Sequence, residues 1–267
     1  MKQSRLLFTT VLLFLLFCVS LKSVSAKENW VRVRSKHFQL IGNAAEKDIR
    51  QVGVKLEQFR EVFRQIFSNF NFNSPIPTNV VVFRDGNTFR NFKPVNDDGT
   101  PRDWVAGYFQ SGEDVNYIVL STEGEKAHPY STIFHEYVHF LVSNDIGRTN
   151  APPWFNEGLA EYYETFQIED DQKVLLGIKR DSHLHLLQKN KLIPFETFFN
   201  MDNHTLHRQG KDGVGLFYAQ AWALMHYLVQ GNAGARNPQL NKFIELVLNG
   251  KTPKQAFIEA FQTDYAT

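Results

Sequence analysis

The segment Ser131-Thr-Ile-Phe-His-Glu-Tyr-Val-His-Phe-Leu-Val142 places two His and one Glu in an otherwise apolar run. Residues four positions apart lie on one face of an α-helix, so His135 and His139 can reach the same metal ion. Glu136 lies between them, where its carboxylate can reach a water on that ion without being a ligand. Because unpaired polar groups are costly away from water, a buried helix with these residues predicts a metal site. The alternative is an ordinary helix with two surface His.

A third ligand is expected on the next helical segment, Pro153-Trp-Phe-Asn-Glu-Gly-Leu-Ala-Glu-Tyr-Tyr-Glu164. A catalytic zinc ion has three protein ligands and one open position, and Glu157 can provide the third ligand from among apolar neighbours. Glu161 lies one helical turn later on the same face. It is expected to accept a hydrogen bond from the free ring nitrogen of a ligating His. The alternative is a pair of acids on a solvated face.

The pattern His135-Glu136-x-x-His139 followed by Asn156-Glu157-Gly158-x-Ala160 resembles the gluzincin metallopeptidases. Within that group it is most similar to the peptidase-MA-like domains of secreted bacterial proteins, and more distantly to the aminopeptidase N and thermolysin families. The resemblance is specific over residues 131–164 and weaker over 213–229. It implies an α+β, zincin-like fold with one zinc ion, held by the two His and Glu157. Glu136 would then be the general base and proton shuttle.

A second part of the resemblance concerns the predicted buried helix Gly215–Leu228. Aminopeptidase-N-like enzymes place a tyrosine at the start of a Y-x-K-G-A helix, where it hydrogen-bonds the oxyanion. Tyr218 matches that tyrosine, but Gln220, Ala221 and Trp222 occupy the positions of the Lys, Gly and Ala, so only the tyrosine itself matches. A packed tyrosine with a satisfied hydroxyl is the alternative, and His226 is a second candidate for the same role. The remaining His of this half are expected at the surface: His183, His185, His204 and His207.

The start of the chain predicts export. Residues 1–26 combine a basic start, an apolar run over 6–19 and a small-residue site at Val24-Ser25-Ala26, as a cleaved secretory signal peptide does. An uncleaved membrane anchor is the alternative, for which the apolar run is short. Cys18 is the only cysteine, so the mature chain would have none. We expect a periplasmic or secreted protein, with no stable membrane span after cleavage.

Charge and composition then limit the class of partner. Without Lys2, Arg5 and Lys22, the 29 basic residues become 26, against 28 acidic ones. A net charge this close to zero gives no electrostatic reason to expect nucleic acid as a partner. With no composition break or repeat, residues 27–267 are expected to form one catalytic domain. Its lobes would span about residues 27–144, with strands and the metal helix, and 145–267, mainly helical.

Apolar patterns predict the elements of the first lobe. Strands are expected at Trp30–Ser35, His37–Ile41 and Asn79–Phe83, and a helix capped by Asn43 through Phe67. Ala106–Gln110 and Val115–Leu120 predict a hairpin. If its second strand is the sheet edge beside the cleft, an extended peptide can add to it as another strand. That expectation concerns Val115, Asn116, Tyr117, Ile118 and Val119, and a plain core strand is the alternative.

These features together predict a zinc-dependent peptidase that hydrolyses a peptide or protein substrate through a metal-bound water activated by Glu136. Tyr218 or His226 would stabilise the oxyanion. The G-A-M-E-N segment with which aminopeptidases hold a free amino terminus is absent, which favours an endopeptidase. One alternative is a non-catalytic binding or envelope-assembly module, against which the intact Glu136 argues. Another is a zinc hydrolase acting on a non-peptide amide.

Overall fold

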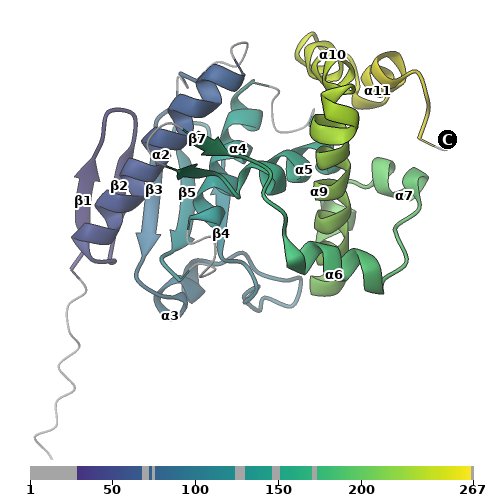
Figure 1. The fold of residues 1–267 in the computed structure, drawn as a ribbon. Helices are drawn as coiled ribbons and strands as arrows, with labels where there is room; N and C mark the ends of the chain where they lie inside the picture. Colours follow the sequence, from purple (N-terminus) through teal and green to yellow (C-terminus); the bar gives the residue numbers. More distant parts are fainter. Residues whose placement is uncertain are drawn as a thin grey trace, which may run out of the picture.

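The computed structural model describes residues 29–67, 72–73, 76–123, 130–145, 151–169 and 173–265. The predicted signal peptide lies outside these ranges, as does part of the loop predicted between the two metal-ligand helices. The described chain combines a mixed sheet with many helices, so the fold class is α+β, as predicted (Figure 1). No helix in these ranges is long and apolar enough to cross a membrane.

A five-stranded sheet forms the first half. Its order is β1-β2-β3-β5-β4. The central strands β2, β3 and β5 are parallel, and β1 and β4 pair antiparallel at the two outer positions. The strands are β1 (Val31–Arg34), β2 (Gln39–Gly42), β3 (Thr78–Phe83), β4 (Gly107–Gln110) and β5 (Asn116–Ser121). The predicted β4–β5 hairpin is therefore confirmed.

The predicted position of the hairpin's second strand at the sheet edge is wrong. β5, which contains four of the five residues Val115 to Val119, pairs with β3 on one side and with β4 on the other. Its side chains at Ile118, Val119 and Leu120 are buried on both faces of the sheet, as expected of an interior strand. The free edge on this side of the sheet belongs to β4.

Two long helices cover one face of the sheet. α2 (Glu46–Ile66) packs on β1 and β2, and α4 (Ser131–Asp145) packs on β4 and β5. The two helices meet where Phe59 stacks on Phe134, with ring centroids 4.6 Å apart. The predicted cap of α2 is wrong: the helix begins after Ala45, and Asn43 instead accepts a hydrogen bond from the backbone of Arg84. A smaller apolar cluster joins Phe89 of α3 (Gly86–Phe89) to Phe83 of β3 and Val119 of β5, and the 3-10 turn η1 (Arg90–Phe92) follows α3.

The second half is mainly helical, as predicted. α5 (Pro153–Tyr163) lies between α4 and the long helix α9 (Gly210–Gly234) (Figure 1). Gly158 of α5 makes this close packing possible, because a Cβ there would lie 2.7 Å from the backbone oxygen of Ala221 in α9. The other elements are β6 (Gln167–Glu169), β7 (Lys173–Leu175), α6 (Asp181–Lys189), α7 (Phe195–Asn200), α8 (Asn203–His207), α10 (Asn237–Leu248) and α11 (Pro253–Phe261).

Candidate metal centre

Three side chains from two adjacent helices converge at one point. In α4, His135 and His139 direct their Nε2 atoms toward α5, where Oε2 of Glu157 lies 3.5 Å and 3.3 Å from them. One ligand atom from each of the three residues lies within 4.8 Å of the others. The ligand atoms of a tetrahedral zinc ion at 2.0–2.1 Å lie about 3.4 Å from one another. The two measured separations agree with that geometry.

The polar atoms at this point lack other partners. Oε2 of Glu157 and Nδ1 of His139 are buried, and neither has a hydrogen-bond partner among the described residues. Burial would raise the pKa of Glu157, but the neighbouring His139 and His135 lower it well below its usual range. A buried carboxylate with an unused oxygen, facing two imidazole nitrogens, fits a divalent cation. These three residues therefore fit zinc.

The second ring nitrogen of His135 faces a carboxylate, but that carboxylate is not the predicted one. Oε2 of Glu164 lies 3.0 Å from Nδ1 of His135, whereas the nearest oxygen of Glu161 is 3.8 Å away. Glu164 is two helical turns after Glu157, so it lies on the same face and reaches further along α4 than Glu161 does. A Glu that accepts from Nδ1 leaves Nε2 as the ligand atom. Burial lowers the pKa of His135, but the neighbouring carboxylates of Glu157 and Glu161 raise it to about 9.

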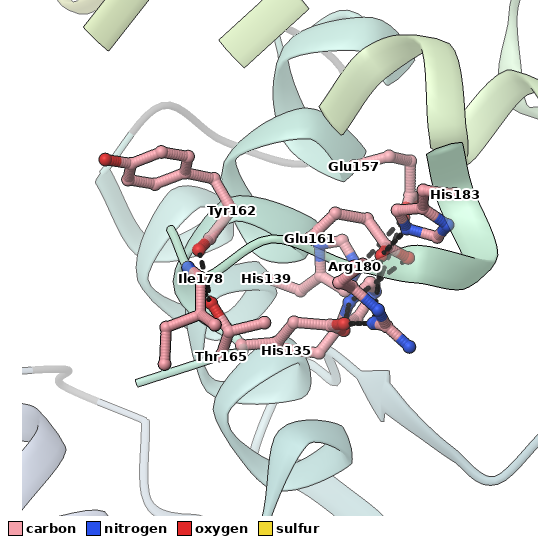
Figure 2. Close-up of polar contacts among 10 residues, drawn as sticks. His135, His139, Glu157, Glu161, Tyr162, Thr165, Ile178, Arg180 and His183 are labelled. Atoms are coloured by element: carbon pink, nitrogen blue, oxygen red, sulfur yellow. Dashed lines mark hydrogen bonds and ion pairs between the residues drawn. The ribbon is translucent and has the colours of Figure 1, made fainter. Parts of the chain in front are cut away.

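Glu161 instead binds two residues from the following segment. Its Oε2 accepts a hydrogen bond from Nε2 of His183 at 2.7 Å. The same oxygen forms an ion pair with Nη1 of Arg180 at 3.3 Å (Figure 2). Arg180 also pairs with Glu164. The expectation that His183 lies at the surface is wrong, because its side chain is buried against this carboxylate. A second group of His135, Glu161 and Glu164 has metal-binding spacing, but the guanidinium already supplies its cation.

The segment that carries Arg180 is anchored to the end of α5. Thr165 is fully buried, and its Oγ1 accepts a hydrogen bond from the backbone of Ile178 at 2.8 Å (Figure 2). Gly177 adopts a φ of +60°, and a side chain there would collide with the ring of Tyr162. Sequence reasoning missed this arrangement. The signal available was Glu164 itself, three residues after Glu161 on the same helix face.

Glu136, the predicted general base, lies beside the candidate ligands. Glu136 is buried and lines the same cavity as the three candidate ligands. Burial raises its pKa, while the charges of His135 and His139 and a hydrogen bond from the backbone of Phe109 in β4 oppose that rise. A carboxylate beside a candidate metal centre is suited to accept and return a proton.

The structure separates the two candidates for oxyanion stabilisation. Tyr218 lines the cavity, and its ring stacks on His135 with centroids 6.2 Å apart. Burial and the charge of Glu157 raise the pKa of Tyr218 well above its ordinary value, so the hydroxyl keeps its proton. His226 lies two turns further along α9, about 12 Å away, and packs on Tyr162 and away from the described lining of the cavity. Burial and the charge of His183 lower its pKa to about 4.

A cavity of about 1100 Å³ surrounds the centre. One wall is the edge strand β4 with the loop before it, and the opposite wall comes from α8 and the first turns of α9. Just before β4, Ala106 accepts a backbone hydrogen bond from Ser121, so by alternation the main-chain groups of Gly107 and Phe109 point away from β5. The site is thus an open cleft with a free strand edge along one side.

Comparison with known proteins locates this site within a shared region. A family model described as "Protein of unknown function (DUF1570)" matches residues 129–245. The matched range contains α4, α5, α6 and α9, and therefore every residue of the candidate metal centre, whereas the five-stranded sheet precedes it. No curated protein matched the chain.

Proposed function

We propose that this protein is a zinc-dependent endopeptidase that acts on peptide or protein substrates outside the cytoplasm. The observation that carries the proposal is the convergence of His135, His139 and Glu157 at the spacing of a tetrahedral zinc site, with an unpartnered carboxylate oxygen. Zinc held there would act as a Lewis acid toward water and the scissile carbonyl. Glu136 adjoins the three ligands on the cavity wall, which fits a base and is not required by a structural metal site.

The protein's own groups have distinct tasks in this reaction. Glu136 accepts a proton from the attacking water and delivers it to the leaving amine. Tyr218, kept protonated by its raised pKa, donates a hydrogen bond to the oxyanion. Glu164 orients His135, and Arg180 pairs with both Glu164 and its neighbour Glu161 and offsets part of their combined charge.

The strand that receives the substrate is β4 and not β5. An extended peptide can lie antiparallel or parallel to this edge and bond to the main-chain groups of Gly107 and to the carbonyl of Phe109, since the N–H of Phe109 bonds to Glu136. Ala106 to Ser111 line the cavity throughout. Main-chain recognition of this kind suits an endopeptidase, because it requires neither end of the substrate.

Metal content and turnover test the proposal together. We expect about one zinc per chain in the mature protein and in Glu136→Gln, but a large loss in Glu157→Ala. Glu196→Ala, at an exposed acid outside the cavity, is the matched control and keeps its zinc. The unchanged protein and the Glu196→Ala control should cleave a mixture of unfolded proteins. Glu136→Gln and Glu157→Ala should not. Absence of zinc from the unchanged protein after metal is supplied would refute the mechanism.

A further inference from the structure

We infer that the cleft binds a carboxylate of the substrate, from an acidic side chain or the C-terminus, between Arg102 on one wall and His207 with Lys211 on the other. This inference rests on the proposed function and names its substrate class. It concerns the part of the cavity away from the candidate metal centre, where the lining has a different charge balance.

The charges on the cavity wall divide into two groups. Near the metal centre, the acids have assigned partners or ligand roles, and Arg180 is paired with two of them. Elsewhere, the described lining contains one acid, Glu123, and three basic residues, Lys93, Arg102 and Lys211. Glu123 accepts a hydrogen bond from the backbone of Gly86 at 2.7 Å. This part of the wall therefore has a net positive charge.

Arg102 is held in place but has no acidic partner. Its backbone donates to the carbonyl of Pro94 at 2.8 Å, which fixes the loop before β4. Its Nε is buried and makes no hydrogen bond to any described residue. The adjacent acid, Asp103, pairs with Arg90 at 3.3 Å instead. A buried donor without a partner is costly, and a guanidinium offers a planar set of donors that matches a carboxylate.

The opposite wall adds two donors. His207 ends α8, and its pKa is lowered by partial burial and by the charge of Arg102, while Glu157 acts in the other direction. The imidazole is therefore neutral near pH 7, so it can donate a hydrogen bond without adding charge. Lys211, in the first turn of α9, is exposed and forms no ion pair with the described residues. Donors from both walls thus line the same cleft.

A carboxylate is the ligand that satisfies all three groups at once. It accepts two hydrogen bonds from a guanidinium, and its charge is favoured beside a lysine. Because these groups line the same cavity as Glu157, a carboxylate bound by them would belong to the substrate in the cleft. The site would therefore favour cleavage next to an acidic residue or near a C-terminus.

Peptide binding to the zinc-loaded, mature Glu136→Gln variant tests this inference without turnover. The probes are four fluorescent pools of random hexapeptides, with Glu or Gln fixed at the centre and a free or amidated C-terminus. We expect at least one carboxylate to tighten binding about tenfold, or about 1.4 kcal/mol, measured by fluorescence anisotropy. Adding Arg102→Gln should reduce this preference to within about twofold. Arg32→Gln, an exposed arginine on β1, should leave it unchanged.

The outcomes separate the two proposals. A preference for fixed Glu identifies a side-chain carboxylate, and a preference for the free acid identifies the C-terminus. Equal binding of all pools, or a preference that survives Arg102→Gln, would overturn the carboxylate site and leave the peptidase proposal intact. No binding of any pool would overturn both. If Arg102→Gln is unstable, Lys211→Gln at an exposed position should give a smaller loss of the same preference.

Discussion

Replacing Glu164 with Gln should weaken zinc binding, although Glu164 is not itself a ligand. Oε2 of Glu164 lies 3.0 Å from Nδ1 of His135, and both side chains are buried. Loss of such a supporting carboxylate typically costs 10–100-fold in metal affinity. Because the Gln amide oxygen can still accept from Nδ1, we expect the lower end, about tenfold, or about 1.4 kcal/mol.

The comparison with Glu161→Gln makes this test decisive. Oε1 of Glu161 is 3.8 Å from His135, beyond hydrogen-bond distance, and the closer partner of Glu161 is His183 at 2.7 Å. We therefore expect Glu161→Gln to change zinc affinity by less than about threefold. Zinc affinity is measured by competition with a chromogenic chelator at fixed pH. Thermal unfolding in excess chelator shows whether each variant keeps its fold. A larger loss of affinity in Glu161→Gln than in Glu164→Gln would refute the assignment.

Three further predictions concern packing, pH and processing. Gly158→Ala should lower the free energy of unfolding in urea by about 1–3 kcal/mol, because the added methyl would force α5 away from α9, whereas Gly215→Ala, whose Cβ would meet its nearest neighbour at 3.8 Å, should not. Burial raises the pKa of Glu57, but hydrogen bonds from His37 and Ser35 lower it below 4.5 overall. The stability it contributes is therefore present above the unfolded pKa and lost as pH falls through the folded pKa. Glu57→Gln should flatten acid unfolding curves there, and an unchanged slope would contradict this. The exported protein should begin at residue 27 by N-terminal sequencing, and an intact first 26 residues would support a retained anchor instead.

Local spacing was sufficient to predict the centre of the site. His135 and His139 share a helix face because of the helical repeat, and the apolar residues around Glu157 indicate a buried second helix. The same rules correctly predicted the hairpin before α4 and the buried helix that carries Tyr218. Each of these inferences depends on residues close together in the chain.

Features that depend on non-local packing could not be obtained in this way. Strand order placed β5 inside the sheet, because its pairing with β3 joins segments far apart in the chain. Docking of the loop before α6 determines which carboxylate meets His135. His183 bonds to Glu161 and Arg180 pairs with both acids, while Oε2 of Glu164 lies 3.0 Å from the imidazole. Likewise, only folding brings Arg102 and His207 to the lining of one cavity. Side-chain partners separated by many residues are selected by how helices and loops pack, and a linear pattern contains no measure of that packing.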